Sequence, residues 1–208
     1  MAVPLMFQPL VKYAQFEGRS RRSEFWLWML FRFLLGQFLG ALAFAFIGPA
    51  FMQFGLHPES FAGHPDQFFQ AYMTAMTPWF RIFPFISVIS LALLVPTLAV
   101  GVRRLHDINR TGWWIILPLV VGIVGCILFL VVGGATLFST IAAHPNGDMP
   151  EGDVVKMVLQ FLGSAFLCLV LPYLIAWIVL FVFLVTEGTR GPNRFGPDPK
   201  PLSQTEAF

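Results

Sequence analysis

Residues able to bind anions are concentrated in three short segments of the chain. These segments read FEGRSRRSEFW (residues 16–26), RRLHDINRTGWW (residues 103–114) and EGTRGPNRFGPDP (residues 187–199). Each combines arginines with acidic residues, glycine or serine and an aromatic side chain. Guanidinium N–H groups match the oxygens of both carboxylates and phosphates. The pattern therefore predicts ion pairs between the segments, binding of an external anion, or both.

The middle segment holds the densest set of titratable groups. If the preceding helix continues through it, Arg103 and Asp107 form an i, i+4 pair on one face. His106 has no second metal ligand at helical spacing, so no metal site is predicted there. Asp107 is expected to accept from an arginine of another segment, and the candidates are Arg19, Arg21, Arg22, Arg190 and Arg194.

The third segment has no helical period and is interrupted by glycine and proline, which indicates a structured turn region. Its spacing matches neither the P-loop nor the dinucleotide fingerprint, so no nucleotide cofactor is predicted. We expect it to pack beneath the helices. Its arginines, Arg190 and Arg194, are predicted to pair with Asp107, Glu17 or Glu24.

Catalytic chemistry has no candidate residues in this sequence. It contains no Ser/His/Asp, Cys/His or paired-carboxylate arrangement of plausible geometry, so we expect a protein that is not an enzyme. His57, His64 and Asp66 suggest an outer metal site, but the neighbouring prolines and Gly63 favour a loop. Cys126 and Cys168 lie in apolar runs and are predicted to be reduced core residues.

Composition places these segments at a membrane. Of 208 residues, 57% are hydrophobic and 12% are charged, and apolar runs of spanning length recur. Such runs must be helical because unpaired backbone groups are costly in hydrocarbon. The prediction is an all-α integral membrane four-helix bundle forming one domain over residues 1–208. The spans are placed at about residues 25–46, 83–102, 113–138 and 157–185.

Three details modify these spans. The first span carries an intramembrane charge, Arg32, which either snorkels to the headgroups or serves a pathway. The fourth is longer than the bilayer and must tilt, protrude or kink at Pro172. Phe68, Tyr72 and Met76 recur at helical spacing, which predicts a short outer helix lying in the interface or packing on the bundle. The N-terminal residues lack a signal-peptide pattern, so the first span is expected to stay uncleaved.

Lys and Arg are distributed unevenly about the spans. Two basic residues, Arg81 and Lys156, flank the spans on one side. Ten lie on the other: Lys12, Arg19, Arg21, Arg22, Arg103, Arg104, Arg110, Arg190, Arg194 and Lys200. Positive flanks stay in the cytoplasm, which predicts that both termini are cytoplasmic.

The RRLHD stretch with Gly112, Trp113 and Trp114, together with the GPNRFGPDP tail, resembles the DUF805 family of bacterial inner-membrane proteins (YhaH-like). The resemblance implies a small protein of the bacterial inner, or cytoplasmic, membrane and supplies no catalytic residues. The outer segments 47–78 and 139–156 look like insertions relative to compact members of that family.

Two functions are compatible with the sequence. The first is a non-enzymatic role in which a basic cytoplasmic face binds anionic lipid headgroups or a membrane protein partner. The alternative is a small transporter or channel component that uses Arg32 and Gln37. Nucleic acid is not an expected partner, because the net charge is only +2. The candidate lipid or partner site contains Arg19, Arg21, Arg22, Arg103, Arg104, His106, Asp107, Arg110, Arg190 and Arg194.

Overall fold

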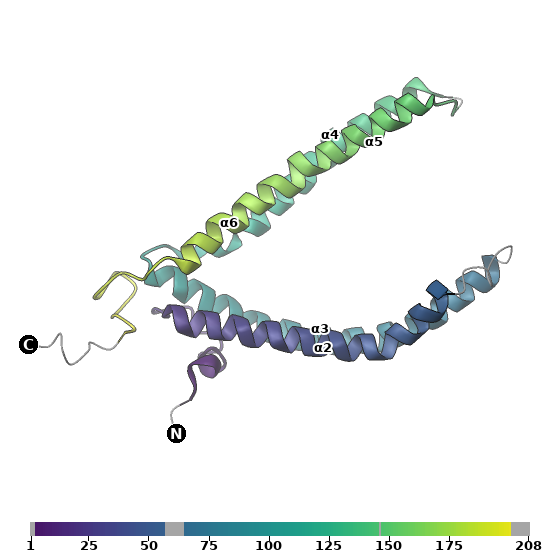
Figure 1. Cartoon of the computed structure of the whole chain (residues 1–208). Coiled ribbons are helices and arrows are strands. Elements are labelled where there is room, and N and C mark those ends of the chain that lie inside the picture. Colours follow the sequence, from purple (N-terminus) through teal and green to yellow (C-terminus); the bar gives the residue numbers. More distant parts are fainter. Residues whose placement is uncertain (1–2, 57–64, 146, 201–208) are drawn as a thin grey trace, which may run out of the picture. The chain divides into compact units, whose positions relative to one another are not determined.

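The computed structural model describes residues 3–56, 65–145 and 147–200, which fold as helices without a β-strand (Figure 1). The short elements η1 (Leu5–Phe7) and α1 (Gln8–Val11) are followed by the long helices α2 (Arg22–Leu56) and α3 (Pro65–Asp107). The 3-10 helix η3 (Gly112–Ile116) leads into α4 (Leu117–Ala143). The last helical stretch comprises α5 (Glu151–Ala165), the π-helical turn η4 (Phe166–Val170) and α6 (Leu171–Val185).

Four helical stretches are long and apolar enough to cross a membrane, which confirms the all-α membrane fold. They cover residues 22–46, 69–107, 112–143 and 151–185. Large apolar side chains on them face outward, including Phe85 at 73%, Leu130 at 71% and Phe138 at 75% exposure. Lipid is the solvent that suits such a surface, and the arrangement is compatible with a helical membrane bundle.

The described helices are longer than the apolar runs suggest. α3 is continuous over 43 residues, about 64 Å at 1.5 Å per residue. The prediction of a separate short outer helix at Tyr72 and Met76 is therefore wrong, because these residues belong to the first turns of α3. The helical spacing of these apolar residues was recognised correctly, but the helix that contains them continues without a break into the predicted span at about residues 83–102. The prolines inside α3 do not end it.

The chain divides into two compact units. Unit 1 contains residues up to 16 together with 23–100, and unit 2 contains residues 17–22 together with those from 101 onward. Unit 1 thus holds most of α2 and α3, whereas unit 2 holds the end of α3, η3, α4, α5, η4 and α6.

Polar contacts around a proline organise unit 1. Pro96 has no N–H, so the carbonyl of Ala92 lacks its helical donor. The hydroxyl of Tyr13 donates to that carbonyl at 2.5 Å. One residue beyond the proline, the Thr97 hydroxyl accepts the indole N–H of the fully buried Trp28 at 3.0 Å. These bonds fix the N-terminal segment and α2 against α3 within unit 1.

In unit 2, α4 runs beside α5, η4 and α6, which return in the opposite direction (Figure 1). Pro172 removes the helical donor for the Cys168 carbonyl, and the π-helical turn η4 directly precedes it. That carbonyl lies against Gly125, where an added Cβ would sit 2.4 Å from its oxygen. The irregularity expected at Pro172 is therefore a π-helical turn that packs tightly on a glycine of α4.

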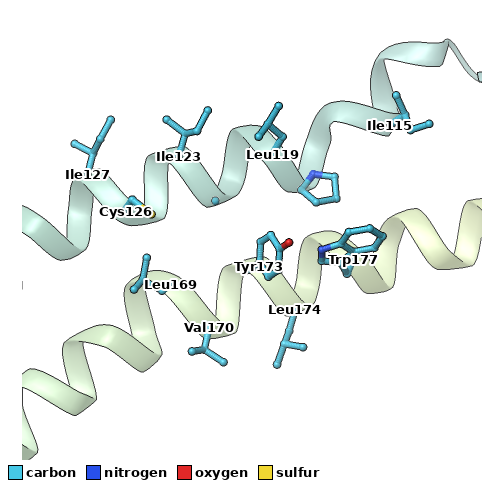
Figure 2. Close-up of a pocket in the computed structure, with 12 residues that line it drawn as sticks. Ile115, Leu119, Ile123, Cys126, Ile127, Leu169, Val170, Tyr173, Leu174 and Trp177 are labelled. Carbon is cyan, nitrogen blue, oxygen red and sulfur yellow. The ribbon is translucent and has the colours of Figure 1, made fainter. Parts of the chain in front are cut away.

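The two cysteines are free thiols, but the prediction that both are buried core residues is wrong. Cys126 is exposed and Cys168 is half-buried. Cys126 lines an apolar groove of about 760 Å³ between α4 and the η4–α6 segment. Figure 2 shows Tyr173 projecting from α6 toward α4 in this groove. An apolar sequence context thus identified membrane depth, but it did not distinguish a lipid-facing side chain from a buried one.

Candidate functional site

The three arginine-rich segments meet at one end of unit 2. We call this region the arginine junction and define it as residues 17–22, 103–111 and 186–200. Its first part is a loop ahead of α2, its second is the end of α3 with the following turn, and its third is the tail after α6. The expectation that the segments pack together is confirmed by the contacts described below.

Asp107, the last residue of α3, lies at the centre of the junction. Its Oδ1 accepts a hydrogen bond from Arg19 Nε at 3.0 Å and lies 2.8 Å from Arg19 Nη2. Its Oδ2 accepts from Arg104 Nη1 at 2.5 Å. All three side chains are at most 5% exposed. Charge-assisted bonds of this kind are strong, and burial keeps water from competing for them.

The two guanidiniums also bind backbone carbonyls of the tail. Arg19 donates to the carbonyls of Gly191 and Thr189, each at 2.5 Å. Arg104 donates to the Leu184 carbonyl at 3.1 Å and to the Thr186 carbonyl. The Leu184 carbonyl belongs to the last turn of α6, where carbonyls have no helical donor and attract positive charge. The same arginines therefore hold Asp107 and fasten the tail beneath α6.

The end of α3 is shaped by local backbone bonds. Asn109 adopts a positive φ of 58°, a conformation that Asn tolerates well. Its N–H donates to the His106 carbonyl at 3.0 Å, and the Arg110 N–H donates to the Leu105 carbonyl at 2.9 Å. From the first segment, the Ser20 N–H reaches the Arg103 carbonyl at 3.1 Å. The turn thus satisfies helix carbonyls that lack internal donors, and the Ser20 bond attaches the loop ahead of α2 to the last turns of α3.

The tail follows the surface of Asp107 closely. A Cβ on Gly188 would lie 2.0 Å from Asp107 Oδ2, so only glycine fits there. The Thr189 N–H donates to the Asp107 carbonyl at 2.9 Å. Farther along, Asp198 accepts from the N–H groups of Lys200 and Gly191, both at 2.9 Å. The bond from Lys200 and, less strongly, that from Gly191 lower the pKa of Asp198 below its ordinary value.

His106 joins the first and third segments. Its Nδ1 lies 3.2 Å from the Gly18 carbonyl, and because a carbonyl only accepts, Nδ1 carries the proton. The imidazole stacks on Phe195, with ring centroids 3.9 Å apart and planes 3° from parallel. The Asn193 side chain donates to the His106 carbonyl at 2.9 Å. The histidine therefore has a packing role and no metal partner in the described part of the chain.

A polar pocket of about 520 Å³ lies beside the junction, and we call it the arginine pocket. It is lined by Ile108, Asn109, Arg110, Thr111, Trp114, Thr189 and Arg194. The Arg110 guanidinium lies 5.3 Å from the Phe183 ring centroid, and that of Arg194 lies 4.6 Å from the Phe195 centroid. Within residues 3–56, 65–145 and 147–200, neither arginine is ion-paired.

Comparison with known proteins agrees with this architecture. The family described as "Protein of unknown function (DUF805)" matches residues 13–143, more than half of the chain. The chain belongs to the DUF805 family. It is 26% identical to inner membrane protein YhaI of Escherichia coli K12 over 92% of this chain and 91% of that protein. Identity to inner membrane protein YhaH of the same strain is 24%, over 92% of each chain. No solved structure matches the chain.

These relatives and the four apolar helices make this DUF805 chain a multi-pass protein of the bacterial inner membrane. The family match includes the first two arginine-rich segments but ends before the third. The buried contacts show why the third segment belongs with them, since its carbonyls are bound by Arg19 and Arg104.

The prediction that Asp107 accepts from an arginine of another segment is confirmed by Arg19, and Arg104, at i, i+3, is a second partner of the carboxylate. The acidic partners predicted for Arg194 and Arg190 are wrong. Arg194 binds the Asn109 carbonyl at 3.1 Å and none of the predicted acids. Arg190 is exposed and forms no ion pair in the described ranges. Arg19 reaches Asp107 because the loop ahead of α2 lies against the end of α3, where the Ser20 N–H also donates to the Arg103 carbonyl.

The candidate site separates into buried and accessible residues. Arg19, Arg103, Arg104 and Asp107 are buried, so they build the junction and do not offer a surface to headgroups. His106 and Arg21 are half-buried, whereas Arg22, Arg110, Arg190 and Arg194 are exposed. Sequence reasoning missed Thr189 and Phe183, which support the pocket. A threonine in a turn and one phenylalanine among many in an apolar span carry no signal of that role.

The charge within the first span is set apart from this junction. Arg32 is half-buried in α2, and its Nη1 is buried without a hydrogen-bond partner among the described residues. Gln37 is exposed on the same helix. Five residues of helix place the two side chains about 140° apart around the axis. His57 and His64, considered for an outer metal site, lie outside the described residues.

Replacing Asp107 by Asn should destabilise the protein strongly. The variant leaves two buried guanidiniums without a carboxylate, which costs about 3 kcal/mol or more. Thermal unfolding of the detergent-solubilised protein measures the effect. Asp148→Asn is the control, because it removes the same charge at an exposed loop position and should change stability by about 0.5 kcal/mol or less. Equal unfolding temperatures for the two variants would contradict a structural role for the buried network.

Proposed function

We propose that this protein binds the anionic headgroup of a membrane lipid in the arginine pocket and that its role is binding, with no catalysed reaction. The observation that carries the proposal is the state of Arg110 and Arg194. Both are exposed at one pocket, both have aromatic rings rather than carboxylates beside them, and both keep donors for a ligand. Phosphate oxygens match such guanidiniums in charge and geometry.

The net charge of the junction supports an anionic ligand. Its three segments contain nine Arg or Lys residues and four Asp or Glu residues, which leaves an excess of five positive charges. Asp107 offsets part of the buried charge of Arg19 and Arg104, and Lys200 holds Glu187 at 3.1 Å. These two acids are thus engaged away from Arg110 and Arg194, and the excess of basic residues keeps the electrostatic potential at the arginine pocket positive.

The position of the pocket along the chain favours a lipid over a soluble anion. Arg110 lies two positions before Gly112, the first residue of η3 and of the apolar stretch 112–143. Trp113 and Trp114 belong to η3, and tryptophans are enriched at membrane–water interfaces. A ligand held by Arg110 therefore lies at the depth of the headgroups.

The transporter alternative has less support. It relied on Arg32 and Gln37, which point to different sides of α2, and a shared polar path would need them on one face. A protein partner that used Arg110 and Arg194 predicts no preference among lipids, and the lipid measurement below tests that directly.

We further propose that the junction and both termini face the cytoplasm, where anionic headgroups attract basic flanks. Reporter fusions after Phe208 and within the loop near Gly147 check the orientation. A reporter active only in the cytoplasm should work after Phe208 and fail near Gly147. The reverse pattern would place the junction on the other side of the membrane.

Lipid selectivity tests the binding proposal. The full chain is placed in nanodiscs with equal amounts of phosphatidylglycerol and phosphatidylcholine, and retained lipids are counted by native mass spectrometry. The unaltered chain should prefer phosphatidylglycerol. Arg110→Gln with Arg194→Gln should lower that preference about thirtyfold, at about 1 kcal/mol for each arginine.

The matched control is Arg22→Gln with Arg190→Gln, which removes the same charge at exposed positions outside the pocket. It should lower the preference less than about threefold, because those charges act only through screened solvent. If both double variants lowered the preference equally, the lipid would be bound by a diffuse basic face and not by the pocket. If the unaltered protein showed no preference for phosphatidylglycerol, the proposal of anionic lipid binding would be wrong.

A further inference from the structure

Trp114 lines two different chambers in unit 2. One is the arginine pocket. The other is an apolar cleft of about 220 Å³, formed with Trp113, Ile116, Leu117 and Val120, which we call the tryptophan cleft. A cationic polar chamber and an apolar chamber thus share one indole as a wall.

The shared wall is held in place by Phe183 of α6. The Trp114 and Phe183 rings meet edge-on, with centroids 5.1 Å apart and planes at 85°. The Arg110 guanidinium lies 5.3 Å from the centroid of that same ring. One phenylalanine therefore positions both the arginine that faces the polar chamber and the tryptophan that faces the apolar one.

We infer that the ligand is a single anionic lipid whose headgroup phosphate lies in the arginine pocket and whose acyl chain enters the tryptophan cleft. This inference rests on the proposed headgroup site and adds the place of the chain. An anionic lipid complements both chambers: its phosphate matches the cationic arginine pocket, and its methylenes match the apolar cleft.

The cleft has the chemistry of an acyl-chain contact. Leu117 and Val120 lie one turn apart at the start of α4, and Val120 is 47% exposed. Trp113 is 77% exposed, so its indole is open to a lipid chain from outside. Because the bilayer is as apolar as the cleft, entry of the acyl chain is stabilised by packing contacts and not by a hydrophobic transfer from water. The cleft therefore determines where the acyl chain lies and adds little to the affinity for the lipid.

Quenching of tryptophan fluorescence by brominated lipids shows where the acyl chain lies. Phosphatidylglycerol and phosphatidylcholine brominated at the same upper acyl carbons are added in turn to nanodiscs that contain the full chain. The brominated phosphatidylglycerol should quench more strongly at equal mole fraction. This excess should fall in Trp113→Phe, which leaves only Trp114 in the cleft, and should be kept in Trp177→Phe, a control that removes another exposed indole away from the tryptophan cleft.

The outcomes separate this inference from the headgroup proposal. An excess that is absent, or that Trp113→Phe leaves unchanged, overturns the placement of the acyl chain, while the lipid count still decides whether Arg110 and Arg194 bind headgroups. An excess that falls in Trp113→Phe and is lost in Arg110→Gln supports one lipid in both chambers. Val120→Phe fills the cleft by a second route and should also remove the excess. The matched Val132→Phe, at 46% exposure on the same helix, should keep it.

Discussion

The carboxylate of Asp107 is buried between the guanidiniums of Arg19 and Arg104, and this arrangement fixes the surrounding structure of unit 2. A buried charge is costly unless its partners and all their donors are satisfied. The remaining donors of the arginines reach carbonyls of α6 and of the tail, which therefore follow one path. Gly188 completes the fit, because a side chain there would collide with the carboxylate. Three segments distant in sequence are thereby held at one end.

This internal neutralisation also determines which arginines face outward. Arg19 and Arg104 are occupied by Asp107 and by carbonyls, whereas Arg110 and Arg194 contact aromatic rings and line a pocket. A cation over an aromatic face stays charged and keeps donors for another ligand. The proposed lipid site is thus a product of the junction, since the buried pairs place the tail that carries Arg194 beside the turn that carries Arg110.

The sequence was sufficient for the number and type of spans and for the meeting of the three segments, because apolar length and charge position follow directly from the bilayer. It was not sufficient to identify Arg104 as the second partner of Asp107, since i, i+3 and i, i+4 neighbours are equally near on a helix. It did not show that α3 continues through the outer segment to Pro65, because proline inside a long helix only weakens it locally. The exposure of Cys126 also depended on packing, which an apolar run does not specify.

The most direct test of this account is a double-mutant cycle between Arg19 and Asp107, measured as the free energy of unfolding in detergent. Arg19→Gln leaves Asp107 Oδ1 without its arginine, and Asp107→Asn leaves Arg19 and Arg104 without their carboxylate. The double variant removes both members of the Arg19–Asp107 pair, and only Arg104 still lacks its partner. We expect the double variant to lose at least about 1 kcal/mol less than the sum of the single losses. Losses that add to within about 0.5 kcal/mol would show independent residues and contradict Asp107 as the organising centre.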